Sequence, residues 1–465
     1  MEKRDLAFVV SACGGELLQG EKNTQVRRVC TDSRAAQAGD LFVALVGDKF
    51  DGHDFLFEVA EKGAVALVVE RERSRAKMPS LASVAVDDTR LALGRIGAAY
   101  RKDFSLPVIA VGGSNGKTST KELIAAVLRQ KLATLWSEAS FNNDIGVPMT
   151  LLRLEKSHQA AVLEVGTNHP GELAPLVEMI APRFGVITTI GREHLEFFGD
   201  VAGVAQEEGV LAELLPADGK LFLNGDNEWT NAIAKRTRAA VVRIGTSAKC
   251  DWRARNVKME KSGMTFTVEA PDEKFSGTYK INLLGRHQVL NAVYAIAVGA
   301  ELGLSRDEIK RGLAGCMPAK MRLEIWESSG VCVLDDAYNA NADSMEAALL
   351  VLQELPCKGR RVAVLGDMAE LGEQSESAHA EVGRRAAELG VEQLIAVGKM
   401  AGVMSTAARG AGLSRVIELV DAEAAATAIK SFLKPGDTVL LKASRATRLE
   451  RISAALRGSN GIGKH

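Results

Sequence analysis

The sequence predicts an α/β protein with three consecutive domains. Short apolar stretches rich in Val, Ile and Leu alternate along the chain with longer stretches of helical spacing, which is typical of parallel sheets covered by helices. A Gly-rich turn follows the buried-type strand 108–111, and a break in composition over residues 315–319 resembles a linker. We therefore expect a small domain of about a hundred residues, a central phosphate-binding domain and a third α/β domain.

The composition is that of an ordinary soluble globular protein. The 465 residues are 46% hydrophobic and 25% charged, with a formal net charge of −1, and they suffice for two to four domains with their own cores. There is no basic run of the kind that binds nucleic acid, and no apolar run approaches the roughly 18–20 residues of a membrane span. The six cysteines are scattered without a C-x-x-C pair, which favours reduced thiols over disulfides or zinc. We expect a cytoplasmic monomer with no nucleic-acid partner and no membrane span.

The first hundred residues predict the small α/β domain. We expect a short helix within residues 5–20 that ends at Gly14-Gly15, followed by strands at 26–30, 41–45 and 64–69. Thr31-Asp32-Ser33-Arg34, taken alone, favours a solvated turn over a site, and residues 47–55 form a polar loop before a helix.

Residues 108–119 are the most informative stretch. A predicted strand leads into the turn Gly113-Ser114-Asn115-Gly116, and Lys117-Thr118-Ser119 then opens an amphipathic helix. The N–H groups of such a turn and the helix N-terminus attract an anion, and Lys117 would add a charge at the β- and γ-phosphates. Val111 stands where a full Walker A motif has its first Gly, so this is the shorter form G-[ST]-x-G-K-[ST]. We predict a nucleoside-triphosphate-binding loop with Thr118 on Mg²⁺; the alternative is a turn that merely caps a helix.

Two further strands of the central domain end near residues of chemical interest. Glu164 lies near the carboxyl end of the predicted strand 161–166, where open α/β sheets bind ligands, so it is a Mg²⁺ candidate rather than a structural ion-pair partner. His194 follows the predicted strand 186–190 and is either a metal or phosphate ligand or a histidine that is only hydrogen-bonded. Residues 140–148 are predicted to be a loop that presents polar side chains.

The remainder of the chain predicts the end of the central domain and the whole of the third. Short alternating strands are expected within residues 220–280, and Gly285 precedes a long Ala-rich helix. Beyond the linker, strands are expected at 331–336, 361–367, 393–398 and 438–442 with helices between them. This order predicts a doubly wound α/β domain.

Several motifs, taken in this order, resemble those of the Mur ligase superfamily of ATP-dependent amide-forming ligases. They are T-D-S-R at 31–34, F-D-G-H-D-F at 50–55, the loop 113–118, N-N-D-I-G-V-P at 142–148, H-L-E at 194–196, M-R-L-E at 321–324, D-D-A-Y-N-A-N at 335–341 and L-G-D-M-A-E-L-G at 365–372. The resemblance covers essentially the whole chain. The last two motifs are the most particular to one branch, which adds D-alanyl-D-alanine to a UDP-N-acetylmuramoyl tripeptide.

The resemblance implies a fold and a reaction. Residues 1–104 would form a UDP-sugar-binding domain, 105–316 a central P-loop ATPase domain and 317–465 a C-terminal Rossmann-like domain for the incoming dipeptide. With ATP and Mg²⁺, the carboxylate of the peptide would take the γ-phosphoryl group, and the dipeptide amine would attack the resulting acyl phosphate and expel phosphate.

The resemblance also implies roles for individual residues. The catalytic set would be Lys117, Glu164, His194 and Arg322, with Arg322 at the γ-phosphate and the metal ions held by Thr118, Glu164, His194 and Glu208. The nucleotide would further contact Gly113, Ser114, Asn115, Gly116, Ser119, Asn291 at the adenine and Asp336 at the ribose, with Asp335 as the alternative. The substrates would be held by Ser33, Arg34, Asp51 and His53 at the uridine diphosphate, by Asn142 and Asn143 along the muramoyl peptide, and by Asp367 and Arg445 at the dipeptide.

Glu208 is the departure from the family pattern that bears on the chemistry. It stands where most relatives have a lysine that becomes carbamylated and holds the second Mg²⁺. A glutamate already ends in a carboxylate, and with an ordinary pKa near ~4.3 it would be ionised at neutral pH. We therefore expect Glu208 to replace the carbamate and turnover to be indifferent to CO₂; the alternative is a solvated helix residue. Ala342 and Ala443, in place of the usual Pro and Gly, imply only local changes of the backbone.

Two other functions remain open at this point. A sister ligase that adds a single amino acid, such as the diaminopimelate- or lysine-adding enzyme or folylpolyglutamate synthase, is disfavoured by the stretch at 335–341. A non-catalytic nucleotide-binding relative is suggested by the missing lysine but disfavoured by the intact Lys117, Thr118, Glu164 and His194. The sequence does not say whether the third residue of the substrate peptide is diaminopimelate or lysine.

Overall fold

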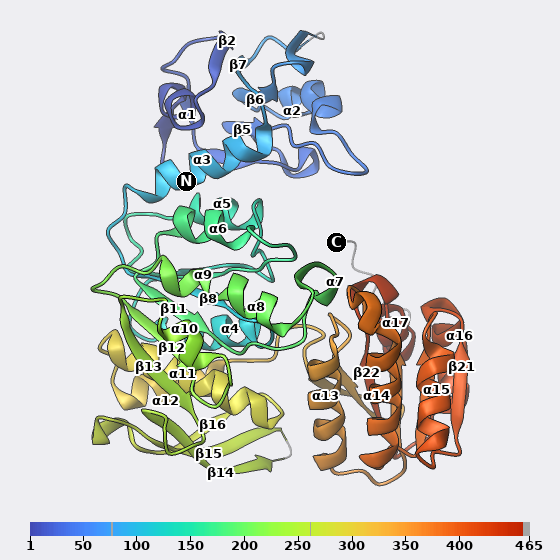
Figure 1. Ribbon diagram of the computed structural model, residues 1–465. Coiled ribbons are helices and arrows are strands. Elements are labelled where there is room, and N and C mark those ends of the chain that lie inside the picture. Colours follow the sequence, from blue (N-terminus) through green and yellow to red (C-terminus); the bar gives the residue numbers. More distant parts are fainter. Residues whose placement is uncertain (76–77, 261, 459–465) are drawn as a thin grey trace.

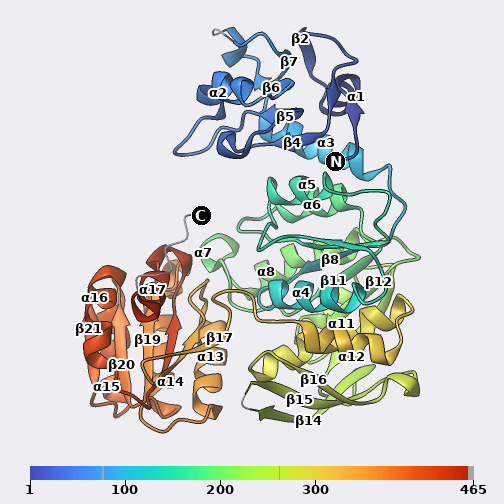
Figure 2. The same ribbon diagram turned by 180° about the vertical axis from the view of Figure 1, so that it is seen from behind.

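The computed structural model describes residues 1–75, 78–260 and 262–458, and these form three helix-flanked sheets in chain order (Figure 1). Figure 2 shows from behind that the N-terminal and C-terminal parts contact different sides of the central part. The α/β class, the P-loop domain and the Rossmann-like third domain are confirmed. The boundaries at 104/105 and 316/317 stay predictions.

The N-terminal sheet has the strand order β2-β7-β6-β5-β4, with β2 antiparallel to β7 and the other pairs parallel. Its strands are β2 (Glu16–Gln19), β4 (Arg28–Cys30), β5 (Asp40–Val43), β6 (Ala66–Glu70) and β7 (Ala82–Val86), and β1 (Arg4–Asp5) pairs separately with β3 (Gln25–Val26). The helices are α1 (Leu6–Cys13), α2 (Leu56–Glu61) and α3 (Thr89–Arg101). The predicted helix ends where expected: α1 stops at Cys13, and Gly14 takes a left-handed conformation with φ of 66° before β2 begins.

The central sheet has nine strands in the order β16-β15-β14-β13-β12-β11-β8-β10-β9. They are β8 (Val108–Gly112), β9 (Thr134–Trp136), β10 (Ala160–Glu164), β11 (Phe184–Ile187), β12 (Lys220–Asn224), β13 (Ala240–Gly245), β14 (Trp252–Glu260), β15 (Gly263–Glu269) and β16 (Gly277–Ile281). The helices are α4 (Lys117–Leu128), α5 (Gly146–Leu151), α6 (Leu173–Ile180), α7 (Leu195–Phe198), α8 (Val201–Glu208), α9 (Val210–Glu213), α10 (Thr230–Ala234), α11 (Arg286–Glu301) and α12 (Arg306–Gly315). Strand β8 lies between β10 and β11, parallel to both, so their carboxyl ends meet at one edge, where such sheets bind ligands.

The C-terminal sheet has the order β17-β18-β22-β19-β20-β21, and all pairs except β17–β18 are parallel. Its strands are β17 (Glu324–Ser328), β18 (Val331–Asp335), β19 (Arg361–Gly366), β20 (Gln393–Val397), β21 (Val416–Leu419) and β22 (Thr438–Lys442). The helices are α13 (Ala342–Glu354), α14 (Ser375–Glu388), α15 (Ala401–Gly410), α16 (Ala422–Phe432) and α17 (Glu450–Arg457). Helices cover both faces of this sheet, which confirms the doubly wound prediction.

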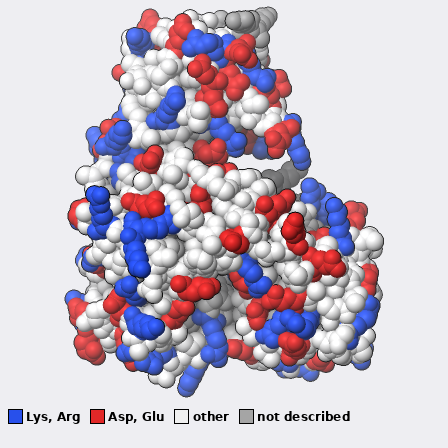
Figure 3. All heavy atoms as spheres, in the orientation of Figure 1, with Lys and Arg blue, Asp and Glu red and all other residues white. Residues whose placement is uncertain are grey.

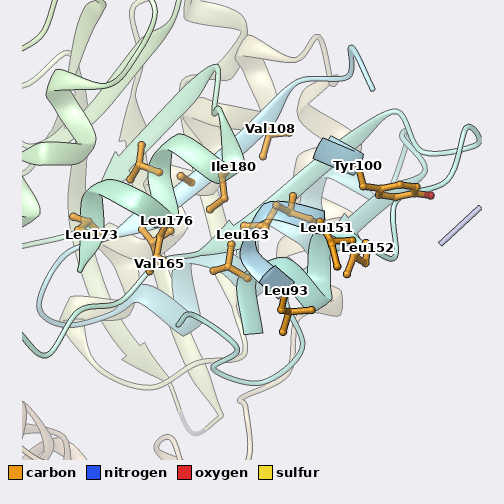
Figure 4. Close-up of a cluster of buried hydrophobic side chains, with 14 of the residues drawn as sticks. Leu93, Tyr100, Val108, Leu151, Leu152, Leu163, Val165, Leu173, Leu176 and Ile180 are labelled. Atoms are coloured by element: carbon orange, nitrogen blue, oxygen red, sulfur yellow. The ribbon is translucent and has the colours of Figure 1, made fainter. Parts of the chain in front are cut away.

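One hydrophobic core joins the N-terminal and central parts. Figure 4 shows Leu93 and Tyr100 of α3, Leu151 of α5 and Leu176 of α6 in one buried cluster, which also includes Leu6 near the N-terminus. The Tyr100 hydroxyl donates a hydrogen bond to the Leu154 carbonyl oxygen at 2.7 Å. These two parts therefore form one packed body.

On the face of the molecule that Figure 3 shows, acidic and basic side chains are interspersed and form no large patch of one sign of charge. No helix in the described part of the chain is both long enough and apolar enough to traverse a bilayer.

Candidate active site

A cavity of about 1670 Å³ lies where the three parts of the chain face one another. Its walls come from the loop 114–119, from α3 and α6, from the start of α11, and from the segments 336–348 and 442–446. Of the predicted site residues, those that line it are Ser114, Asn115, Gly116, Lys117, Thr118, Ser119, Asn142, Asn143, Glu164, His194, Asn291, Arg322, Asp336 and Arg445. The structure thus gathers the four predicted catalytic residues around one space, together with the predicted nucleotide-binding residues other than Gly113; neither Gly113 nor the predicted metal ligand Glu208 lines it within the described chain.

The phosphate loop has the geometry that its glycines permit. Gly113 and Gly116 have φ values of 107° and 86°, which residues with a side chain rarely adopt. A Cβ atom at Gly113 would lie 2.5 Å from Thr188 Oγ1, so the loop packs too closely on the segment after β11 for any other residue there. Helix α4 begins at Lys117, directly after the loop, and its N-terminus faces the cavity.

Lys117 lies among carboxylates and backbone oxygens of its own domain. Its Nζ donates to the Gly113 carbonyl oxygen at 2.5 Å and is 3.3 Å from Glu193 Oε2. Burial opposes its charge, but Glu193, Glu208 and Glu164 outweigh this effect and hold the pKa of Lys117 above its usual value. Lys117 is therefore cationic in this site.

Glu164 ends β10 and is buried at the predicted edge. Its Oε1 accepts a hydrogen bond from Asn142 Nδ2 at 2.9 Å, whereas its Oε2 has no hydrogen-bond partner among the described residues. Lys121, four residues after Lys117 on α4, is fully buried, with Nζ 3.9 Å from Glu164 Oε2. Asn142 therefore orients Glu164, a contact that the sequence did not predict.

These residues fit a magnesium ion that a nucleotide brings with it. The buried Oε2 of Glu164 is a potential oxygen ligand that makes no hydrogen bond within the described chain, and the Thr118 hydroxyl and His194 line the same cavity. Within residues 1–75, 78–260 and 262–458, no three His, Cys, Asp or Glu side chains converge as a preformed metal cage. Magnesium suits such an open site, since it usually keeps several waters and takes one or two carboxylates together with substrate phosphates.

Glu208 is buried, and its pKa differs from that of an ordinary carboxyl group. It is fully buried at the end of α8, and its Oε2 accepts a hydrogen bond from the Gly113 N–H at 2.6 Å. Burial raises the pKa of Glu208 to about 8, and Lys117 offsets this only in part. The expectation that Glu208 has an ordinary carboxyl pKa is therefore wrong, because its side chain is fully buried. The solvated-helix alternative is also wrong.

Arg322 links the C-terminal part to the phosphate loop. Its guanidinium donates to Ser140 Oγ at 3.1 Å, and Ser140 Oγ is 3.4 Å from Thr118 Oγ1. Arg322 and Arg445 lie over the ring of Tyr338 at 4.2 and 5.9 Å from its centroid. Two cations from distant stretches of the chain therefore meet at one wall of the cavity.

The residues predicted to contact adenosine lie on another wall. Asn291 is buried, and its Oδ1 would lie 2.9 Å from a Cβ atom placed on Gly116. The Asn291 side chain therefore packs directly against the phosphate loop. Asp336 accepts hydrogen bonds from Lys442 Nζ at 2.5 Å and from the Leu323 N–H at 3.1 Å. Asp335, the alternative for the ribose, is instead buried against Ser453, at 2.6 Å, and does not line the cavity within the described chain. That alternative is wrong.

The residues predicted to hold the uridine diphosphate lie apart from this cavity. Ser33, Arg34, Asp51 and His53 are absent from its walls in the part of the chain that is described. Both ring nitrogens of His53 make hydrogen bonds inside the domain: Nδ1 with Asp51 at 2.7 Å and Nε2 with the Glu70 N–H at 2.9 Å. The N-terminal wall is formed instead by α3 and the two residues that flank it, a set that includes Asp88, Arg90, Leu91, Arg95 and Lys102.

Two more predicted substrate residues have clear local partners. The Asn143 carboxamide oxygen accepts a hydrogen bond from the Gly146 N–H at 2.8 Å, and α5 begins at Gly146, within the segment predicted to be a loop. Both carboxylate oxygens of Asp367 accept backbone N–H groups, from Lys399 and Met400, each at 2.9 Å. Their predicted contacts with substrate stay predictions.

Sequence reasoning missed several residues of the site. Lys121 could have been found from its spacing of four residues from Lys117, which places both on one helix face. Glu193 directly precedes His194, and Glu370 lies in the quoted motif 365–372, but their proximity to Lys117 and His194 depends on tertiary packing.

The chain matches three domain families of known proteins in the same order. They are the Mur ligase family catalytic domain at residues 25–101, the Mur ligase middle domain at 111–299 and the Mur ligase glutamate ligase domain at 321–445. The UDP-N-acetylmuramoyl-tripeptide–D-alanyl-D-alanine ligase of Escherichia coli (strain K12) is 39% identical over 97% of this chain and 98% of its own length.

Solved structures agree with this match. A crystal structure of MurF from Acinetobacter baumannii superposes with a TM-score of 0.89 at 32% identity, covering 98% of this chain and 99% of the other. MurF ligase from Thermotoga maritima in complex with ADP gives a TM-score of 0.80 at 27% identity, covering 93% and 97%. A phosphate loop, a buried carboxylate and a Rossmann-like third domain, matched along nearly the full length of both chains, lead to one assignment: the chain belongs to the Mur ligase family.

Proposed function

We propose that the chain joins D-alanyl-D-alanine to a UDP-N-acetylmuramoyl tripeptide with ATP, a step of peptidoglycan precursor synthesis. The observation that carries this proposal is the convergence of Arg322 and Arg445, from the C-terminal part, with the phosphate loop of the central part around one cavity. A ligase of this kind must bring a nucleotide, an acid and an amine together, and a cavity walled by three domains can do so. Relatives that match nearly the whole chain carry the name of this reaction.

The phosphate loop and its neighbours would act on the first step. The peptide carboxylate attacks the γ-phosphorus, the bond to the β-phosphate oxygen breaks, and ADP leaves. Because such a transfer needs alignment and charge neutralisation more than covalent help, Lys117 and Arg322 would balance the negative charge on the moving phosphoryl group.

The C-terminal wall would act on the second step. The dipeptide amine attacks the acyl carbon, loses a proton, and phosphate leaves with the oxygen that came from the peptide carboxylate. Arg445 beside Tyr338 offers a cation for the dipeptide carboxylate.

The metal would be held by Thr118, Glu164 and His194, with Glu208 as a further ligand at the back of the phosphate loop. When bound, Mg²⁺ neutralises phosphate charge and aligns the β- and γ-phosphates. Glu164 is fixed for this role by Asn142, which occupies its other oxygen.

We further assign the N-terminal part to the UDP-sugar, the central part to ATP and the C-terminal part to the dipeptide. We also propose that the protein acts as a monomer in the cytoplasm. All six cysteines are free thiols, which suits a reducing compartment.

The test is a product analysis with purified protein, ATP, Mg²⁺ and UDP-N-acetylmuramoyl tripeptides carrying either diaminopimelate or lysine. Mass spectrometry should show an adduct with D-alanyl-D-alanine and none with single amino acids. The same assay is run with a shorter UDP-N-acetylmuramoyl precursor and single amino acids. Ligation of diaminopimelate, lysine or glutamate to that precursor would instead assign the chain to a sister ligase. Nucleotide binding without any adduct would indicate a non-catalytic relative.

A further inference from the structure

The segment that follows β11 is hydrogen-bonded to the C-terminal part of the chain. Arg192 donates to Asp343, on α13, from Nε at 2.7 Å and from its backbone N–H at 2.8 Å. Its Nη1 also donates to Glu381 Oε2, on α14, at 2.8 Å. A Cβ atom at Gly191 would lie 2.5 Å from Asp343 Oδ2, so these two segments of the chain approach as closely as a glycine allows.

Two residues after Arg192, His194 meets a carboxylate of the same C-terminal part. Its Nδ1 is hydrogen-bonded to Glu370 Oε2, and the Glu370 carbonyl oxygen accepts the Glu196 N–H at 3.1 Å. A Cβ added at Gly372 would lie 3.2 Å from Glu196 Cα, so the loop 370–372 lies directly on α7. His194 itself has a left-handed backbone, with φ of 47°. The ring orientation of His194 is therefore set from outside its own domain.

This contact determines which ring nitrogen can bind a ligand. A carboxylate can only accept, so Nδ1 of His194 carries the proton and Nε2 keeps its lone pair. Histidines that bind metals usually donate their other N–H to a carboxylate in this way, which fixes the ring and makes the ligating nitrogen more basic.

We propose that Glu370 is the positioning residue of His194 and that docking of the C-terminal part therefore completes the metal site of the central part. This inference rests on the proposed function, because it takes His194 as a metal ligand. The Arg192 clamp on Asp343 and Glu381 holds the docked arrangement, and Asn341 adds a hydrogen bond at 3.0 Å to the phosphate-loop residue Asn115. Metal affinity then depends on side chains that never touch the metal.

The proposal predicts metal binding, not only turnover. Mn²⁺, which replaces Mg²⁺ and is visible by electron paramagnetic resonance, would be titrated into the full chain with ADP. Glu370→Ala should weaken Mn²⁺ binding about 10–100-fold, the usual effect of removing such a carboxylate. Glu370→Gln should recover part of this loss, since its amide oxygen still accepts the Nδ1 proton. Arg192→Ala should also weaken binding, while ADP affinity measured without metal stays unchanged.

A control and a double variant make the result decisive. Glu423→Ala removes an exposed glutamate that pairs with Arg451 inside the C-terminal part, and it should leave Mn²⁺ binding unchanged. In the His194→Ala background, Glu370→Ala should have no further effect, because its target is gone.

The outcomes separate the two proposals. If the wild-type protein with ADP does not bind Mn²⁺, the metal assignment under the proposed function fails. If it binds but Glu370→Ala is within twofold of wild type, or its effect is undiminished in the His194→Ala background, the positioning role of Glu370 is overturned.

Discussion

At the residue scale, we propose that the phosphate chemistry depends on the cation of Lys117. The nearby Lys121 cannot replace it, because its Nζ is held by the Ser137 and Ala139 carbonyl oxygens at 2.7 and 2.6 Å. We expect Lys117→Ala to lose roughly 3–4 kcal/mol of transition-state stabilisation, as for other preorganised electrostatic contacts. The measurement is kcat/KM for ATP, with the exposed Lys131→Ala as control. Retention of more than about a tenth of wild-type kcat/KM, a loss under about 1.4 kcal/mol, would show that the assigned role is wrong.

Glu208 poses a sharper question at the same scale, because it could bind metal or merely hold the phosphate loop. Glu208→Gln keeps an oxygen for the Gly113 N–H but cannot become a carboxylate. If Glu208 is a metal ligand, turnover should fall at least about tenfold in this variant, comparable to loss of other supporting groups at metal sites. We also expect wild-type turnover to be unchanged by removal of CO₂, and Glu208→Lys to be weak with partial recovery on adding bicarbonate. Near-normal turnover of Glu208→Gln would leave the hydrogen bond to Gly113 as its role.

The positions of site residues could be predicted from the sequence where the predicted strands and turns determine them. The turn 113–116 and Glu164 at a strand end lie at the predicted edge because a parallel sheet brings those ends together. The acidity of Glu208 could not be predicted, because it depends on burial under a loop 95 residues away in sequence. The predicted roles of individual side chains at this site stay predictions.

At the element scale, the loop that carries Glu370 is held by a buried histidine of α14. His379 is fully buried; its Nε2 accepts the Met368 N–H at 2.8 Å, and its Nδ1 is 2.6 Å from the Ser375 carbonyl oxygen. Burial lowers the pKa of His379 below its usual value. The unfolded chain therefore takes up a proton first as the pH falls below about 6.5, and the stability present above that pH is lost on acidification.

This linkage can be tested by urea unfolding at about pH 7.5 and about pH 5.5, on either side of the ordinary histidine pKa. Wild type should lose stability between the two, and His379→Gln should lose less. His169→Gln, at a half-exposed histidine, is the matched control. An identical loss in wild type and His379→Gln would contradict a buried neutral His379.

The elements themselves were largely predictable, and the misses have physical causes. Buried parallel strands such as β8, β10 and β19 are continuous apolar runs, which is a strong local signal. The predictions lack β17 because its polar residues resemble loop sequence, and they lack β21 because it is only four residues long and half-exposed. Helix α5 begins at Gly146, within the predicted loop, and the Asn143 side chain accepts the Gly146 N–H just before it; in sequence, such an Asn is typical of a turn.

At the scale of the whole molecule, the two interfaces differ in kind. The N-terminal and central parts share one apolar core across α3, α5 and α6, whereas polar contacts such as Arg192–Asp343 and Arg322–Ser140 join the central and C-terminal parts. Polar interfaces of this kind permit relative domain motion. We therefore expect the C-terminal part to be the one that moves during turnover. The sequence could not predict this, because which residues share a core depends on docking.

A truncation tests the division of labour. The fragment 1–316 keeps the two central cores and the N-terminal core, while the cores of the last sheet come almost entirely from residues beyond 316. We expect this fragment to bind the UDP-sugar substrate by calorimetry, with circular dichroism as the check of folding, and to form no amide bond. Ligation by the fragment would contradict the assignment of the dipeptide to residues 317–465.

The central claim is that three domains enclose one reaction in which ATP activates a peptide carboxylate for attack by an amine. The direct measurement uses UDP-N-acetylmuramoyl tripeptide labelled with ¹⁸O in its terminal carboxylate, together with ATP and D-alanyl-D-alanine. Each phosphate released should carry one ¹⁸O atom, because the oxygen that bridges carbon and phosphorus in the acyl phosphate leaves with phosphate when the amine attacks. Release of unlabelled phosphate alongside the ligated product would contradict the account.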